Sequence, residues 1–171
     1  MQNISVISTH ILILSSKNDI VFDNAYKWGI QRMMTLIKDV SLDSRVESLL
    51  AYATDSNKVT SAYERYLADE CCLLYGYEVE GELVGVVGVQ LTDPYEAEIL
   101  QIAVDPDHRG CGIGKHMLSY LAKWHELTKV IAKTDAQAVE FYRTLGFTAQ
   151  SLGEMYPACE RFCCEFDFDK R

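Results

Sequence analysis

The fold of this chain is decided by one glycine-rich stretch, VDPDHRGCGIGK at residues 104–115. The residues just before it, Glu96 to Ala103, form an apolar-rich run of strand length. After it, apolar side chains recur at helical spacing at Ile113, Met117, Leu121 and Trp124. The stretch therefore predicts a turn that joins a strand to the first residues of a helix.

Backbone amides in this turn predict an anion-binding site. Its glycines can adopt positive φ angles, and they place no Cβ between the peptide N–H groups and a ligand. N–H groups in the first turn of a helix lack partners within the helix and carry the positive end of its dipole. Arg109 and Lys115 add full positive charge on either side. These features favour a phosphate-bearing ligand over the alternative, a glycine-rich turn that binds nothing.

The turn does not match the two commonest phosphate-loop patterns. A P-loop would need a glycine where Arg109 stands and a hydroxyl side chain where His116 stands. The dinucleotide fingerprint Gly-x-Gly-x-x-Gly fails because Lys115 occupies the place of its third glycine. The pattern that fits is Arg-x-x-Gly-x-Gly, with Arg109, Gly112 and Gly114 at its fixed positions.

Two segments of the chain resemble motifs of one known family. The first is the Arg-x-x-Gly-x-Gly pattern with Val104-x-Pro106 before it. The second is TDAQAVEFYRTLGF at residues 134–147, in which Ala-x-x-Phe-Tyr is followed by Gly-Phe. In this order and at this separation they resemble the acetyl-CoA pyrophosphate loop and the later helix motif of the GNAT acetyltransferase superfamily. The resemblance covers roughly residues 71–168.

The resemblance implies a mixed α/β fold in one acetyltransferase domain over residues 1–171. We expect a twisted mixed sheet of about six to seven strands flanked by helices, with the acetyl-CoA loop between the fourth strand and the following helix. The sequence predicts strands at residues 4–14, 71–79, 82–92, 96–104, 129–132, 147–152 and 160–168, with a hairpin turn at Glu80-Gly81. It predicts later helices at residues 113–127 and 136–145.

Three helical stripes are expected between the first two strands, where the family has helices that wall the acceptor cleft. The first begins at Asp23 or Asn24 and carries Ala25, Trp28, Met33, Leu36, Ile37 and Val40. The second begins at Asp43 and carries Val46, Leu49, Leu50 and Ala53. The third begins at Ser56, with Val59, Ala62, Tyr63, Tyr66 and Leu67 facing inward. These stripes are typical of core packing.

The resemblance also implies where acetyl-CoA lies. Its pantetheine amides would pair with strand backbone near Ile102 and Val104, where the family's strand splays from its parallel neighbour. Asp135 stands where the family commonly has Asn; it can still cap a helix, although it adds negative charge. The full predicted cofactor set is Ile102, Ala103, Val104, Arg109, Gly110, Cys111, Gly112, Ile113, Gly114, Lys115, Asp135 and Ala138. Positive charge for the cofactor could come from Arg109, Lys115, His116, Lys133 and Arg143.

Two side chains are predicted to be catalytic. An acceptor amine of pKa ~10.4 is made neutral at pH 7 at a cost of roughly 4.6 kcal/mol, so a base is useful. Glu98 resembles by position the family's strand glutamate, and Glu96, on the same strand face, or a water relay could substitute. Tyr142 resembles the family's helix tyrosine, which faces the leaving thiolate. The alternative for Glu96 and Glu98 is that they are solvated carboxylates near a strand end. The alternative for Tyr142 is that it is an ordinary half-buried tyrosine without a catalytic role.

The composition of the chain limits the classes of partner that it is expected to bind. A net charge of −9 argues against nucleic acid and anionic membranes and is compatible with a cationic amine. No secretory leader is evident, so a cytoplasmic location is expected. The six cysteines form no Cys-x-x-Cys and are expected to be reduced, and Cys111 has no evident base partner. A partial His-Glu-x-x-His at residue 125 lacks its second histidine because Lys129 stands there, so no metal is expected.

The sequence therefore predicts an acetyl-CoA-dependent N-acetyltransferase that transfers directly, in a ternary complex, to a primary amine of a small molecule or peptide. The alternative is a non-catalytic acyl-CoA-binding sensor with the same fold, because the loop would look the same in both. The acceptor is not legible, since specificity lies in loops and first helices that carry no motif. The long final strands could pair across a homodimer.

Overall fold

Eight strands form one mixed sheet in the part of the chain that the computed structural model describes, residues 20–22, 31–156 and 159–169. In chain order they are β1 (Ile20–Phe22), β2 (Arg32–Leu36), β3 (Cys72–Val79), β4 (Glu82–Asp93), β5 (Glu96–Val104), β6 (Lys129–Asp135), β7 (Thr148–Tyr156) and β8 (Cys159–Asp167). Their order across the sheet is β1-β2-β3-β4-β5-β6-β8-β7. Every neighbouring pair is antiparallel except β5 and β6, which are parallel.

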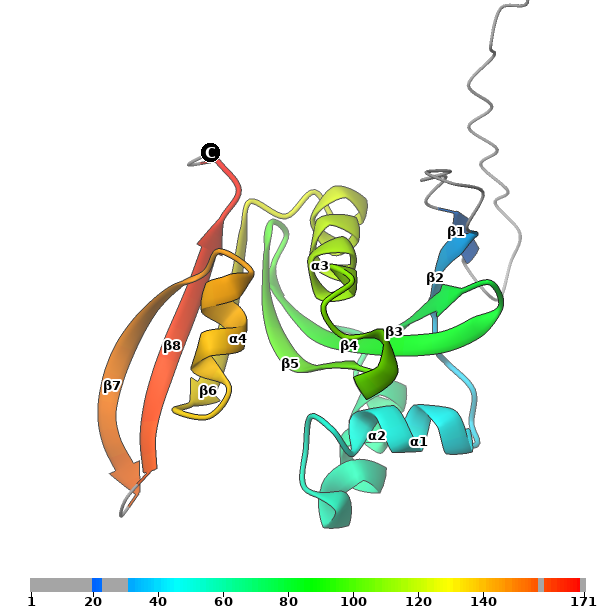
Figure 1. Ribbon diagram of the computed structural model, residues 1–171, viewed down its shortest axis with the longest axis horizontal. Coiled ribbons are helices and arrows are strands. Elements are labelled where there is room, and N and C mark those ends of the chain that lie inside the picture. Colours follow the sequence, from blue (N-terminus) through cyan, green and yellow to red (C-terminus); the bar gives the residue numbers. More distant parts are fainter. Residues whose placement is uncertain (1–19, 23–30, 157–158, 170–171) are drawn as a thin grey trace, which may run out of the picture.

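Four α-helices cover the two faces of this sheet (Figure 1). α1 (Ser44–Leu50) and α2 (Val59–Ala68) pack on one face, over residues of β3, β4 and β5. α3 (Ile113–Trp124) and α4 (Val139–Thr144) pack on the other face, and their core includes residues of β6 and β8. The expected α/β class is thus confirmed, and each face of the sheet has its own hydrophobic core.

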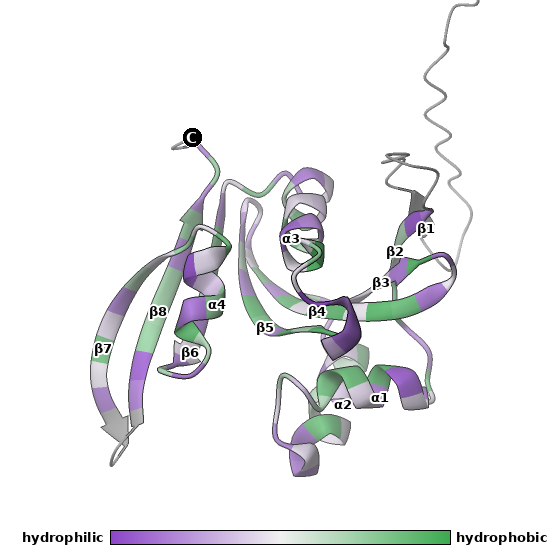
Figure 2. Cartoon of the chain, in the orientation of Figure 1, coloured by the Kyte–Doolittle hydropathy of each residue, from purple (hydrophilic) through white to green (hydrophobic). Residues whose placement is uncertain are grey.

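Local sequence explains why the main elements begin and turn where they do. Asp43 caps α1 by accepting hydrogen bonds from the N–H groups of Arg45 and Val46, as the sequence predicted. The β3–β4 hairpin turns at Glu80 and Gly81, both at positive φ, which suits the right-handed twist of the strands. The hydrophilic segment between β5 and α3 stands out against the apolar central strands in Figure 2. That segment belongs to the glycine-rich stretch at residues 104–115.

The predicted helix that begins at Asp23 or Asn24 is wrong in its described part. Arg32–Leu36 form β2, which pairs antiparallel with β3 and buries Met34. An apolar run of this length fits a strand as well as a helix, and the free edge of β3 decides the matter by offering hydrogen bonds along its length. Residues 23–30 and the predicted strand at residues 4–14 lie outside the described residues.

Two smaller corrections concern the next helix. Asp55 rather than Ser56 accepts the capping hydrogen bond, from the N–H of Asn57, and a short 3-10 turn (Ser56–Lys58) precedes α2. Leu67 was expected to face inward but is 40% exposed, because the buried face of α2 ends with Tyr63 and Tyr66. The strand before the glycine-rich stretch is fifth rather than fourth in chain order, since β1 and β2 both precede β3.

Candidate active site

Six successive backbone N–H groups lie free at the start of α3. Those of Gly110 to Lys115 donate to no acceptor among the described residues, whereas the next, that of His116, donates to the carbonyl of Gly112 at 3.0 Å. Gly110 and Gly112 have φ of 77° and 76°, and Gly112 is the N-cap of α3. A run of free amides at the positive end of a twelve-residue helix can hold a diphosphate.

Residues 104–109, the stem of this loop, lead into the free amides. They are held in place by the buried carboxylate of Asp105. The side chain of Asp105 accepts from the backbone N–H of Asp107 at 2.9 Å through Oδ1 and from Arg45 Nη2 at 2.8 Å through Oδ2. The hydrogen bond from Asp107, with further help from Arg45 and His108, holds the pKa of Asp105 below its ordinary value. Asp105 therefore stays ionised and fixes the 3-10 turn Pro106–His108 that leads into the free amides.

Arg109 and Lys115 differ in how they present their charge. The Arg109 side chain folds back, with Nε donating to the carbonyl of Val104 at 3.1 Å and Cζ lying 5.5 Å from the centroid of the Tyr52 ring. Lys115 is exposed and has no ion pair within the described ranges. Lys115 is therefore the side chain best able to add charge to the amides, while Arg109 braces the loop.

The other three basic candidates have different surroundings. Lys133 forms an ion pair with Glu98 at 3.0 Å on the face of the sheet opposite α3, so its charge is taken up there. Arg143 forms an ion pair with Glu140 on α4. His116 is half-buried on α3 and hydrogen-bonded through Nδ1. Lys133 and Arg143 are exposed, as Lys115 is, but each is already paired with a carboxylate.

The parallel strands β5 and β6 open into a V beside this loop. They pair only from Glu96 to Ile99 on β5 and from Lys129 to Ala132 on β6. A register shift against β4 marks a β-bulge at Leu100, and a bulge bends the strand that carries it. Beyond the bulge, no described strand pairs with β5 on its β6 side. Predicted residues Ile102, Ala103 and Val104 lie on this open part of β5, where a ligand amide could pair with the backbone.

Tyr142 lies on α4, in the core that α3 and α4 form with residues of β6 and β8. Its ring makes edge-to-face contacts with Phe141 and Phe147, and the side chain is buried. Its hydroxyl has no hydrogen bond to any described residue. Burial, with a smaller contribution from Cys164, raises its pKa above the ordinary value of 10, so the phenol stays protonated. A protonated phenol without a partner is able to donate a hydrogen bond to a ligand atom that gains negative charge.

The start of the α4 segment is organised by Asp135. Its Oδ1 accepts hydrogen bonds from the N–H groups of Gln137, at 2.9 Å, and Ala138, at 3.1 Å. The carboxylate therefore holds the turn that precedes α4, whereas the N-cap of α4 is Ala138, which makes no side-chain capping hydrogen bond; the predicted helix at residues 136–145 begins at Val139. Ala138 is half-buried beside it and immediately precedes α4.

Glu96 and Glu98 project from β5 on the face that carries α1 and α2, since the intervening Ala97 is buried in the core beneath α3. Each is held by a lysine of β6: Lys129 Nζ lies 2.6 Å from Glu96, and Lys133 Nζ lies 3.0 Å from Glu98 Oε2. The side chain of Glu98 is 19% exposed, about half the value for Glu96 at 39%. Glu98 also lies nearer the opening of the V.

Sequence reasoning missed a contact on the same face, next to the bulge. The hydroxyl of Tyr66 on α2 donates to Gln101 Oε1 on β5. A Cβ at Gly88 would approach that hydroxyl to under 3.0 Å, so the absence of a side chain at Gly88 permits this close approach. Tyr66 was predicted to be buried, but nothing in its helical spacing signalled a polar partner on β5.

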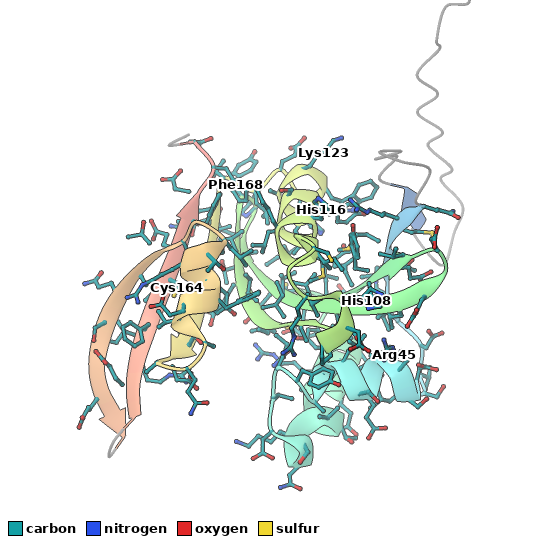
Figure 3. The ribbon with its side chains drawn as sticks, viewed as in Figure 1. Arg45, His108, His116, Lys123, Cys164 and Phe168 are labelled. Carbon is teal, nitrogen blue, oxygen red and sulfur yellow. The ribbon has the colours of Figure 1, made fainter. Side chains whose placement is uncertain are left out.

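A cavity of about 360 Å³ lies beside α3, away from the V. Its walls are mainly apolar and include Leu118, Phe147, Phe166 and Phe168, with Lys115 and Lys123 at α3. Lys123 and Phe168 mark this region in Figure 3. It shares only Lys115 with the predicted cofactor residues, so it is a different hollow from the opening between β5 and β6.

Two other chemistries can be compared with the structure. Cys111 is exposed, and its thiol contacts the carbonyl of Arg109 at 3.8 Å, with no base hydrogen-bonded to it in the described ranges. Among the described residues, no group of three or more His, Cys, Asp or Glu side chains could hold a metal ion.

No described helix is long and apolar enough to cross a membrane.

A mixed sheet whose one parallel pair opens beside free helix-N-terminal amides defines an α/β protein suited to a long, phosphate-bearing ligand. Residues 32–147 match the acetyltransferase (GNAT) family model. The chain belongs to this family.

Individual relatives cover less of the chain. It is 34% identical over 74 residues to the uncharacterized N-acetyltransferase in the lysA 3′ region of Bacillus methanolicus, covering 43% of this chain and 62% of that protein. It is 32% identical over 102 residues to N-alpha-acetyltransferase RimI of Mycobacterium tuberculosis, covering 56% and 65%. The chain thus spans less than two thirds of the length of either relative.

A solved structure shares the fold over most of its length. The GNAT family acetyltransferase from Elizabethkingia anophelis, determined with acetyl-CoA bound, superposes with a TM-score of 0.62 at 17% identity, over 80% of this chain and 97% of that one. At this identity the likeness shows the fold alone.

Proposed function

We propose that this protein is an acetyl-CoA-dependent N-acetyltransferase that moves the acetyl group directly to a primary amine. The observation that carries the proposal is the run of six free amides at residues 110–115, placed beside the open edge of β5. The amides would hold the diphosphate, and the edge beyond Leu100 would pair with the pantetheine amides. Membership of the family and the acetyl-CoA in the Elizabethkingia anophelis protein support this ligand.

The transfer requires removal of a proton from the amine and a proton donor for the departing thiolate. The amine nitrogen bonds to the acetyl carbon as the carbon–sulfur bond breaks, so the amine loses a proton and the thiolate gains negative charge. Tyr142, protonated and without a partner among the described residues, would donate a hydrogen bond to that thiolate. Because burial raises its pKa, full transfer of its proton is costly, and stabilisation of the thiolate comes first.

Glu98 is the carboxylate that would accept the amine proton. Lys133 holds its Oε2, while Oε1 has no partner in the described part of the chain. Oε1 could therefore take the proton directly or through a water molecule. Glu96 is the substitute base, although its greater exposure and its position farther from the opening favour Glu98.

The acceptor class follows from the relatives in broad terms only. The M. tuberculosis relative is named an N-alpha-acetyltransferase, and a protein of Escherichia coli that is 41% identical over 61 residues is named a peptidyl-lysine N-acetyltransferase. We therefore propose a primary amine of a peptide or small molecule as acceptor. The net charge of −9 is compatible with a cationic amine.

The proposal is tested by incubating the protein with acetyl-CoA and a panel of peptide and small-molecule amines. Acetylated products are identified by mass spectrometry, and a reaction without amine controls for hydrolysis and for the exposed thiols of Cys71 and Cys111. We expect transfer to at least one amine. Binding of acetyl-CoA without transfer to any amine would favour the sensor alternative, and absence of binding would contradict both.

A further inference from the structure

Two side chains at α1, Arg45 and Tyr52, hold the residues from which the free amides start. Arg45 Nη2 reaches Asp105 at 2.8 Å, and its Nε donates to the carbonyl of Leu83 at 2.9 Å. Tyr52, in the turn after α1, places its ring 5.5 Å from the guanidinium carbon of Arg109. The labelled Arg45 and His108 in Figure 3 show α1 lying beneath this part of the loop.

The two contacts fix the loop at both ends of its stem. Asp105 links Arg45 to the 3-10 turn, because its second oxygen accepts from the Asp107 N–H. Arg109 closes the stem by donating to the carbonyl of Val104, and Tyr52 covers its guanidinium. Residues 104–109 are therefore tied to α1 immediately before the free amides begin at Gly110.

We propose that Arg45 and Tyr52 are positioning residues for diphosphate binding, acting through Asp105 and Arg109. The inference rests on the proposed function. Free amides that already point outward spare the ligand the entropy cost of ordering the loop. When the stem is released from α1, binding must order it again, so affinity falls for ligands that use the amides.

This role differs from general support of the fold. A pantetheine thioester lacks the diphosphate, and in the proposed binding mode it would contact the open edge of β5 and not the loop. Its KM should therefore stay unchanged when the stem is released, whereas the Kd of CoA should rise. The kcat at saturating acetyl-CoA should stay near that of the wild type, because neither residue lies at Glu98 or Tyr142.

The test compares Tyr52→Leu, Tyr52→Phe and Arg45→Ala with the wild type, and uses Lys58→Ala as a matched surface control. Tyr52 is 54% exposed, so its substitution leaves the core intact. We expect Tyr52→Leu to raise the Kd of CoA about threefold, the effect of one exposed cation–π contact, and Tyr52→Phe to restore it. Loss of the charged hydrogen bonds in Arg45→Ala should raise the Kd about tenfold or more.

Calorimetry gives the Kd of CoA, and turnover of acetyl-pantetheine and acetyl-CoA gives KM and kcat. An unchanged CoA Kd in Tyr52→Leu overturns the inference even if Arg45→Ala fails to fold. An equal rise in the KM of acetyl-pantetheine also overturns it, because the role would then be structural. If the wild type itself binds no CoA, the proposed function fails as well. The wild-type titration alone therefore separates failure of the proposed function from failure of the positioning role of Arg45 and Tyr52.

Discussion

Replacing Tyr142 with phenylalanine removes one hydroxyl that has no hydrogen bond to a described residue. Transfer of a phenol proton of pKa ~10 to a thiolate of pKa ~8.5 is uphill by about 2 kcal/mol, and burial of Tyr142 raises its pKa and this cost further. In the proposed mechanism, donating a hydrogen bond to the thiolate is therefore easier than giving the proton away. Such a bond to a charged group contributes about 1.5–3 kcal/mol, so we expect kcat to fall about 10- to 150-fold.

The same variant should bind acetyl-CoA normally and remain folded. The ring contacts with Phe141 and Phe147 persist in phenylalanine, so the melting temperature should stay the same or rise slightly. Steady-state kinetics with one acceptor amine, with calorimetry for acetyl-CoA, measures both effects. An unchanged kcat would remove Tyr142 from the mechanism, and an equal loss of acetyl-CoA affinity would make it a binding residue instead.

Three further outcomes are expected. Gly88→Ala forces a Cβ against the Tyr66 hydroxyl and should lower the free energy of unfolding by about 1–3 kcal/mol. The melting temperature should then fall by about 2–12 °C, and an unchanged melting temperature would contradict this packing. Glu98→Gln should lower kcat about 10²- to 10⁴-fold with CoA affinity kept; full activity would move the base role elsewhere. Burial lowers the pKa of His125, so its contribution to stability is present above pH about 6.5 and lost as pH falls through the lowered pKa. His125→Gln should flatten that acid-side fall in melting temperature, and an unaltered slope would refute it.

The strand-loop-helix unit could be predicted because its signals are local. A glycine turn, an apolar run before it and helical spacing after it each constrain the backbone within a few residues. The hairpin at Glu80-Gly81 and the Asp43 cap were predicted for the same reason. The strand Arg32–Leu36 was missed because its partner, β3, lies about forty residues further along the chain, and periodicity carries no information about such pairing.

In the candidate site, too, some residues could be predicted from local sequence and others could not. The residues whose free backbone amides would bind the ligand follow from the loop motif itself. The side chains that hold the loop, Arg45 and Tyr52, belong to a different helix region, and no spacing in the sequence connects them to Asp105 and Arg109. The partnership of Glu98 with Lys133 likewise depends on the register between β5 and β6, which only the folded sheet defines.

We propose that the free amides of residues 110–115 hold the diphosphate of CoA. Amide chemical shifts of the ¹⁵N-labelled protein, recorded during titration with CoA and separately with pantetheine, test it most directly. We expect the six N–H resonances from Gly110 to Lys115 to move with CoA and to stay in place with pantetheine. Saturable binding of CoA that leaves these six resonances unmoved would show that the diphosphate binds elsewhere.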